Sequence, residues 1–102
     1  MFRLTEHRLS GRLVLKLEGR CSWEVIAELE ASWQAARREA RGDEIWIDLS
    51  DVLLVDDAAR VQLARMYRAG ARFMWRGCLM HELVREITHA GVAGDEKGSV
   101  RS

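Results

Sequence analysis

The sequence predicts a single α/β domain: a mixed β-sheet of about four to five strands, with three to four helices packed against it and a β-hairpin at its start. Two observations lead to this fold class. Apolar residues alternate along the chain between the period of a strand and the period of a helix. The length of 102 residues and the hydrophobic content of 48% suit one core. We place the domain at residues 1–92 and expect a flexible polar tail at residues 93–102.

A β-hairpin is predicted at the start of the chain. The apolar segments 2–9 and 12–18 flank Ser10-Gly11, and a two-residue connection that contains glycine is typical of a tight hairpin. Within the second segment, every other residue is a leucine, which predicts one buried and one wetter face: Leu13, Leu15 and Leu17. We expect this strand to end at Gly19.

The clearest helix pattern follows. We expect the Ser22 side chain to cap this helix, with Glu24 at the positive end of the helix dipole and Gly42 just beyond its C-terminal end. Apolar residues then recur at spacings of three and four, which predicts the stripe that faces the core: Ile26, Leu29, Trp33, Ala36 and Ala40.

Strands and helices continue to alternate after this helix. Residues 45–49 predict a buried strand, parallel to the previous one because a helix connects them, and residues 52–55 extend it. Asp56 or Asp57 can cap a second helix that ends near Gly70.

The last two elements are a further strand and a helix. Residues 71–75 predict the strand. The final helix carries its apolar stripe at Leu79, Leu83 and Ile87, and we expect Gly91 and Gly94 to end it.

The central part of the sequence resembles a known family. Residues 45–59 read IWIDLSDVLLVDDAA, and the predicted helix after them ends in Arg68-Ala69-Gly70-Ala71. This pattern is similar to the STAS domain (sulphate transporter and anti-sigma factor antagonist), from the second strand to the final helix, and implies a STAS-like fold. In bacterial anti-sigma factor antagonists the signature reads Asp-Ser, a small residue and Gly at the start of the second helix. Here Asp56 matches the aspartate, Asp57 replaces the serine and Ala59 replaces the glycine.

The resemblance implies a non-catalytic module that regulates transcription by binding protein. In such antagonists the serine is phosphorylated by a partner kinase that is also the anti-sigma factor, and the unphosphorylated form sequesters that kinase. Asp57 lacks the hydroxyl, but it supplies permanently part of the negative charge of phosphoserine. The domain is then either held in a phosphorylated-like state or adapted to a partner that needs no phosphorylation, and both alternatives stay open. Ser50 is an alternative phosphorylation site.

We expect a protein partner to contact the loop before the second helix and the exposed side of that helix. The residues chosen for this surface are Asp56, Asp57, Ala58, Arg60 and Val61, acting through contact and charge complementarity. The resemblance implies two partner classes: a kinase-like anti-sigma regulator, or the ATPase of a transporter, including lipid ABC transporters with a cytoplasmic STAS subunit. A homodimer also stays open. As caps alone, Asp56 and Asp57 would have a purely structural role.

Composition argues against several other classes. Sixteen basic and sixteen acidic residues give a net charge of zero, without the basic surplus that nucleic-acid binding usually needs. No apolar run approaches the roughly 20 residues that span a bilayer, so we expect a cytoplasmic protein without direct membrane insertion.

An enzyme is the minor alternative. Cys78 lies at the start of the last helix, where the dipole can lower a thiol pKa, and His81 follows as a candidate base, but no third orienting group is evident. The histidines and cysteines lack the close paired spacing of zinc sites, and phosphate-binding glycine loops are absent. We therefore predict no catalytic residue, metal or cofactor, and expect Cys21 and Cys78 to be reduced thiols.

Two further groups of residues bear on binding. Trp33 and Trp46 fall at predicted buried positions, whereas an exposed Trp23 or Trp75 would be a binding anchor. A basic strip on and beyond the second helix is interpreted as a solvated helix face: Arg60, Arg65, Arg68 and Arg72.

Overall fold

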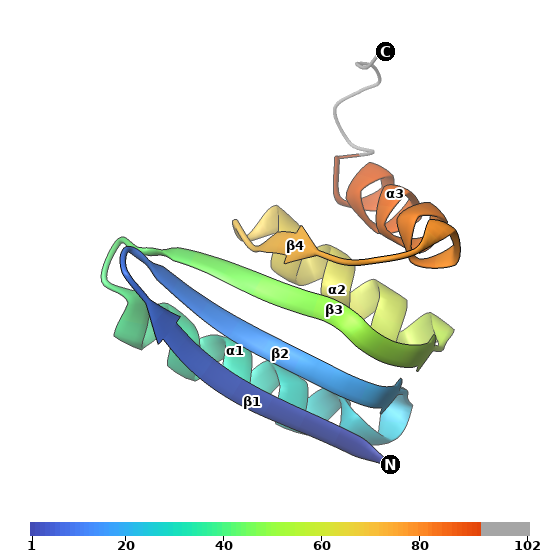
Figure 1. Ribbon diagram of the computed structural model, residues 1–102, viewed down its shortest axis with the longest axis horizontal. Coiled ribbons are helices and arrows are strands. Elements are labelled where there is room, and N and C mark those ends of the chain that lie inside the picture. The colour runs from blue at the N-terminus through green and yellow to red at the C-terminus, as the bar shows by residue number, and fades with distance from the viewer. Residues whose placement is uncertain (93–102) are drawn as a thin grey trace.

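A four-stranded mixed sheet organises the chain (Figure 1). The computed structural model describes residues 1–92, without the side chains of residues 78, 79 and 90–92. The elements are β1 (Phe2–Leu9), β2 (Arg12–Cys21), the 3-10 helix η1 (Trp23–Val25), α1 (Ile26–Ala40), β3 (Glu44–Val55), α2 (Asp57–Arg68), β4 (Arg72–Met74) and α3 (Cys78–Val92). The predicted fold class and the opening hairpin are confirmed. The expected tail at residues 93–102 lies outside the described residues.

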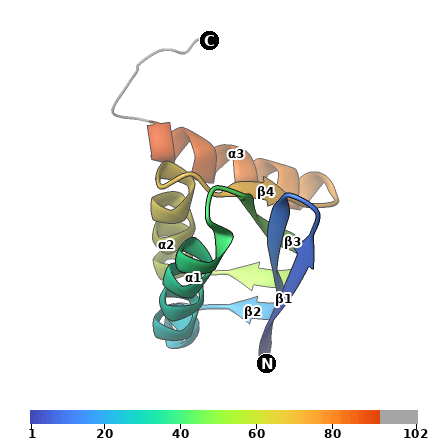
Figure 2. The same cartoon turned by 90° about the vertical axis from the view of Figure 1, so that its left-hand side faces the viewer.

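The connections explain the layers. Strands lie in the order β1-β2-β3-β4; β1 is antiparallel to β2, and β2, β3 and β4 are parallel to their neighbours. Both parallel crossovers advance across the sheet in the same direction, and the strong preference for right-handed crossovers then places their helices on the same face. Figure 2 shows α1 and α2 together on one side of the sheet, with α3 across the β4 edge. Within residues 1–92, the opposite face carries no helix layer.

The core lies between the sheet and the two crossover helices. Alternate residues of β2 and β3 are completely buried on this face: Leu13, Leu15, Leu17, Ile47 and Leu49. The predicted stripe of α1 meets them, and four of its five members are buried: Leu29, Trp33, Ala36 and Ala40. Between the helices, the buried Gln62 of α2 donates a hydrogen bond to Glu30 of α1. Its amide is therefore satisfied within the core.

Trp46 was expected to be buried, and this prediction is wrong. Its neighbours Ile45 and Ile47 face the helices, so the two-residue period of the strand turns Trp46 to the uncovered face, where it is partly exposed. Arg12 of β2 and Arg72 of β4 lie over its ring, 4.7 Å and 6.0 Å from the centroid, and its indole Nε1 donates to Glu44. On this face, which has no helix layer, the two guanidinium groups partly cover the indole ring through cation–π contacts.

The end of β2 also differs from its prediction. The strand continues past Gly19 to Cys21, with a shift in its register against β3 between Gly19 and Arg20. Gly19 has a φ of +90°, and a Cβ atom there would clash with the carbonyl oxygen of Met1. The Arg20 amide donates to that same carbonyl at 2.9 Å. Glycine therefore lets two backbones approach closely without ending the strand.

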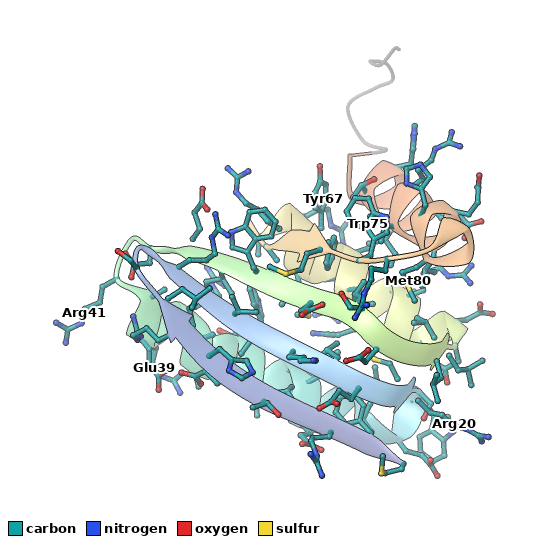
Figure 3. The ribbon with its side chains drawn as sticks, viewed as in Figure 1. Arg20, Glu39, Arg41, Tyr67, Trp75 and Met80 are labelled. Atoms are coloured by element: carbon teal, nitrogen blue, oxygen red, sulfur yellow. The ribbon has the colours of Figure 1, made fainter. Side chains whose placement is uncertain are left out.

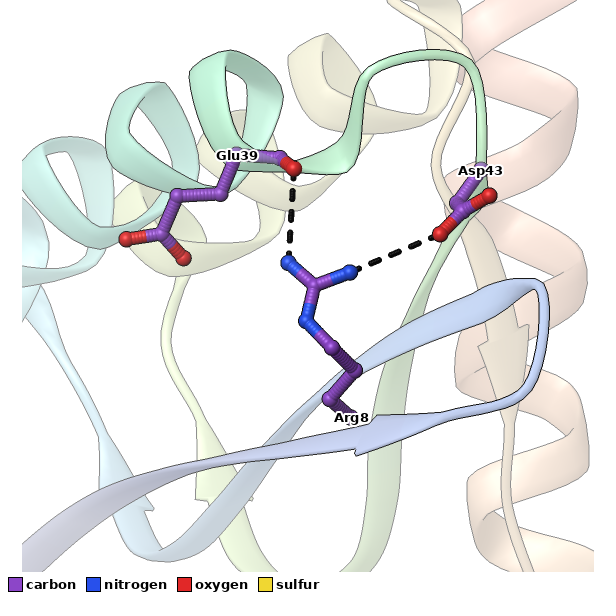
Figure 4. Close-up of polar contacts among 3 residues, drawn as sticks. All are labelled: Arg8, Glu39 and Asp43. Carbon is purple, nitrogen blue, oxygen red and sulfur yellow. Dashed lines mark hydrogen bonds and ion pairs between the residues drawn. The ribbon is translucent and has the colours of Figure 1, made fainter.

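An arginine on the hairpin holds the C-terminal end of α1. Arg8 of β1 donates to the carbonyl oxygen of Glu39 at 3.3 Å and to the Asp43 carboxylate at 3.5 Å (Figure 4). Arg41, in the left-handed conformation with φ of 50°, ends the helix there. A cation beside the last carbonyls complements the helix dipole.

The last helix passes the first of the two glycines expected to end it, and Gly94 lies outside the described residues. Ile87 is buried, as the apolar stripe predicts, and Leu83 of the same stripe is partly buried; Val84 beside them is buried as well. However, α3 runs through Gly91 to Val92, so Gly91 does not end it. Glycine lowers helix stability at an interior position without forbidding it.

Candidate functional site

Asp56 links two junctions of the chain, the one between β2 and η1 and the one between β3 and α2. One carboxylate oxygen, Oδ1, accepts a hydrogen bond from the amide of Ala59 at 2.9 Å and caps α2. The other, Oδ2, accepts from the amide of Trp23 at 2.8 Å, at the start of η1. The Asp56 amide in turn donates to the carbonyl of Cys21. Asp56 thus acts as a structural bridge between chain segments, and its oxygens are engaged in that role.

The expected cap at Ser22 is wrong. Ser22 precedes η1 in an extended conformation, but its side chain makes no capping hydrogen bond. The amide of Trp23 is satisfied by Asp56, 33 residues away in the sequence. Sequence reasoning about a cap considers only nearby residues, and here the acceptor comes from the neighbouring strand.

Cys21 lies beneath this junction as a buried free thiol. Burial raises the pKa of the Cys21 thiol from its ordinary value of 9.0 to about 11, and the negative charge of Asp56 adds to the increase. The thiolate is therefore strongly disfavoured, which suits packing rather than nucleophilic chemistry.

Asp57 is more exposed than its neighbour Asp56. It occupies the first turn of α2 with an exposed side chain, and Ala58 and Val61 are also exposed. Asp57 and Val61 are four residues apart and therefore share one side of the helix. The structure thus presents three of the five predicted contact residues to solvent, while Asp56 is engaged beneath them.

Arg60, the fifth predicted residue, points to another element. Its Nη1 lies 3.2 Å from Oε1 of Glu86 on α3, and the residue is partly buried. This ion pair links the start of α2 to α3. Arg65 and Arg68 are exposed, whereas Arg72 extends over Trp46 on the uncovered face of the sheet, so the four arginines do not form one strip.

Exposed apolar side chains flank the junction. The exposed fractions are 70% for Trp23, 82% for Leu53, 51% for Leu54 and 59% for Val61. They come from η1, the end of β3 and the first turns of α2, which Asp56 and the pairing of Arg20 with Leu54 bring to one end of the sheet. We name this surface, with Asp57 and Ala58, the α2 N-terminal surface.

Sequence reasoning identified only part of this surface. An exposed Trp23 was recognised as a binding anchor, whereas Leu53 and Leu54 were assigned only to a short extended apolar segment, without a role in binding. The register shift after Gly19 leaves Leu53 without a partner residue in β2, and both leucines project near the strand's end, where no crossover helix covers them. An apolar run at the end of a predicted strand carries no signal that separates buried from exposed side chains.

The structure adds little support for a catalytic site at Cys78 and His81 or for a metal site. His81 is exposed, with its ring 5.9 Å from that of Trp75, and the Cys78 side chain lies outside the described residues. Among the side chains described, no group of three or more His, Cys, Asp or Glu residues is placed to hold a metal ion. No helix in the described part of the chain is both long enough and apolar enough to cross a membrane.

Comparison with known proteins defines the class of fold. No protein-family model matches the chain, and no curated protein matches its sequence. Among solved structures, the arrangement of strands and helices is that of the SpoIIAA-like fold, which is the fold of STAS domains and anti-sigma factor antagonists.

The similarity to this fold comes from an uncharacterised protein of Shewanella loihica PV-4, from the DUF3478 family, whose structure is described as SpoIIAA-like. It has a TM-score of 0.58 and 13% identity over 83% of this chain and 75% of that one. A second structure, of Mglu, matches with a TM-score of 0.51 and 23% identity over 72% of this chain but only 19% of its own, much longer chain. At these identities the comparisons establish the fold.

Proposed function

We propose that this chain is a regulatory module that binds another protein through the α2 N-terminal surface. The observation that carries the proposal is the concentration of exposed apolar side chains there. Seven large apolar side chains are exposed among the described residues, and four of them are Trp23, Leu53, Leu54 and Val61. Exposed apolar side chains that gather at one end of a domain are characteristic of interaction sites, and tryptophan is enriched among residues that dominate binding energy.

The surface also has the rigidity that an interface needs. Asp56 fixes η1 and α2 relative to each other through its two hydrogen bonds, and Arg60 links α2 to α3 through Glu86. A preorganised surface loses less conformational entropy on binding. The exposed Asp57 adds a charge that favours a partner with a basic group opposite it.

The partner class that the STAS resemblance and the SpoIIAA-like fold support is a kinase-like anti-sigma regulator. In this proposal Asp57 replaces the phosphorylatable serine, so the contact is permanently charged and needs no phosphorylation. The SpoIIAA-like fold supports a regulatory role in general, and the kinase is the specific part of the proposal. A transporter ATPase is the partner that the experiment below would identify instead.

The experiment begins with capture by tagged protein from the native lysate, followed by purification of the recovered partner. Calorimetry would then compare Trp23→Ala, which removes the most exposed aromatic side chain of the surface, with the matched Trp75→Ala at another site. We expect Trp23→Ala to weaken binding by more than about tenfold and Trp75→Ala to leave the affinity unchanged. Equal affinities for both variants would contradict the proposed surface.

Position 57 tests the nature of the partner. Asp57→Arg should also reduce the affinity for the partner, because it reverses a charge within the α2 N-terminal surface. If the partner is a kinase, Asp57→Ser offers it a hydroxyl, and ATP with Mg²⁺ should lead to phosphorylation at residue 57. A captured ATPase that is indifferent to Asp57→Ser would replace the kinase in this proposal.

A further inference from the structure

A second site lies away from the α2 N-terminal surface. A cavity of about 310 Å³ lies where β3, β4, α2 and α3 meet. Four of the chain's seven Trp, Tyr and Phe residues line it: Trp46, Tyr67, Phe73 and Trp75. Figure 3 shows Tyr67 and Trp75 beside β4, whereas Arg20 lies at the far end of β2. We propose that this cavity binds a small aromatic carboxylate.

The aromatic walls come from three different elements. The rings of Tyr67 on α2 and Phe73 on β4 are stacked, with centroids 6.0 Å apart and an angle of 15° between their planes. Trp46 approaches from the uncovered face of the sheet, and Trp75 follows β4, with the His81 ring of α3 5.9 Å away. A planar ring can contact such walls by offset stacking or by its edge.

The lining is largely apolar but also carries positive charge. None of the nine described residues that line it is acidic, and two of them carry guanidinium groups, Arg72 and Arg85. The acidic neighbours of these arginines lie outside the lining: Glu44 is 3.5 Å from Arg72, and Glu82 is 3.4 Å from Arg85. These separations exceed the 2.7–2.9 Å of a close charge-assisted hydrogen bond, and the four side chains are between 44% and 65% exposed.

An incoming carboxylate would therefore compete with Glu44 and Glu82 for the guanidinium groups of Arg72 and Arg85. Arginine matches the planar carboxylate with two parallel hydrogen bonds, and it does so best beside surfaces that exclude water. Ligand sites in proteins combine apolar and aromatic walls with a few polar groups, and about 300 Å³ is the lower end of their size range. The cavity thus suits one or two fused rings bearing a carboxylate rather than a larger molecule.

The test uses 2-naphthoate as the probe and 2-naphthylmethanol as its uncharged match. Titration of the isotope-labelled full chain would be followed by amide and indole NMR signals. We expect saturation below about 1 mM for 2-naphthoate, with shifts of the Trp46 and Trp75 indole signals and unchanged signals for Trp23 and Trp33. The uncharged probe should bind at least about fivefold more weakly.

Matched variants test separately whether the aromatic walls and the arginines contribute to binding. Trp75→Ala and Arg72→Gln should each raise the dissociation constant of 2-naphthoate roughly five- to tenfold, because each removes a stacking surface or an anion contact. Trp23→Ala and Arg68→Gln, which alter exposed residues outside the cavity, should leave it unchanged.

Three results would overturn the proposal. They are failure of 2-naphthoate to saturate, indole shifts at Trp23 instead of Trp46 and Trp75, and equal binding of the charged and uncharged probes. Since the controls include Trp23→Ala, the experiment separates this site from the protein-binding surface proposed above. Either proposal can therefore fail without the other.

Discussion

The turn from β3 into α2 joins two regions that use adjacent residues for different purposes. The inner region, with Asp56, Cys21, Ala59 and Leu63, holds the junction together through hydrogen bonds and buried contacts. The outer region is the α2 N-terminal surface, whose apolar and charged side chains face solvent. Asp56 belongs to the first region and Asp57 to the second.

This division has a geometric cause. Asp56 is extended while Asp57 already belongs to the helix, so their side chains leave the backbone in different directions. The same residue type therefore satisfies backbone amides at one position and presents free charge at the next. We expect substitutions in the inner region to lower the free energy of unfolding, and substitutions in the outer region to lower partner affinity alone.

The largest effect is expected at Leu63, which is completely buried on the inner side of α2. Leu63→Ala should lower the free energy of unfolding by about 3 kcal/mol, because it leaves a cavity between α2 and the sheet. Urea denaturation followed by circular dichroism would measure this loss. The control is Val61→Ala on the exposed side of the same helix, which should change stability by less than about 0.5 kcal/mol. Similar losses for the two variants would contradict the division.

A smaller loss is expected for Asp56→Ala, which removes the acceptor of the Ala59 and Trp23 amides. We expect a decrease of about 2 kcal/mol in the free energy of unfolding, since a helix cap and a second charge-assisted hydrogen bond are lost. Asp56→Asn keeps an oxygen acceptor and should lose about half as much. If Asp56→Ala proved as stable as Asp56→Asn, the bridge between η1 and α2 would not stabilise the fold.

The buried thiol predicts a dependence on pH. Because the folded-state pKa of Cys21 is about 11, and the thiol in an unfolded chain titrates at its ordinary value of 9.0, the native state retains the proton to higher pH. Below the unfolded pKa this thiol adds no pH dependence. Between the two values the unfolded state loses its proton first, so stability should fall as the pH rises.

Urea midpoints at pH 7.5 and pH 10 would measure this decrease in wild type and in Cys21→Ala. Other groups also titrate in this range, so the difference between the two proteins is the relevant quantity. Cys21→Ala should be less stable at pH 7.5 but should lose less stability on going to pH 10. A decrease of the same size in both proteins would show that Cys21 does not cause it.

Much of the inner region could be predicted from the sequence. The alternation of Leu13, Leu15 and Leu17 predicted the buried face of β2, and the spacing of the α1 stripe predicted its core contacts, because both depend on local periodicity. The cap of α2 by Asp56 was one of two alternatives for the same reason. The hydrogen bond from Trp23 to Asp56 was not foreseen, since it depends on which strands become neighbours.

The outer region and the aromatic cavity were less predictable. Whether Leu53, Leu54 and Trp46 are buried depends on the register of β3 and on which face the crossover helices cover. Both are properties of the assembled sheet, and an apolar residue in a strand has the same local pattern in either case. Trp46 was therefore assigned to the core, although it lines a cavity at the β4 edge.

The smallest effect on stability is expected at Asp57, and it separates the two regions most directly. Asp57→Ala should change the free energy of unfolding by less than about 0.5 kcal/mol, because an exposed first-turn carboxylate interacts only weakly with the helix dipole. Its effect on the partner should be kinetic: an exposed charge at an interface mainly accelerates association and makes it sensitive to salt. Stopped-flow or surface plasmon measurements with the purified partner should show a lower association rate for Asp57→Ala at low salt. The difference from wild type should disappear at about 1 M salt, where the screening length falls to about 3 Å. A variant that lost stability as Asp56→Ala does, or that bound as fast as wild type at low salt, would place Asp57 outside the binding surface.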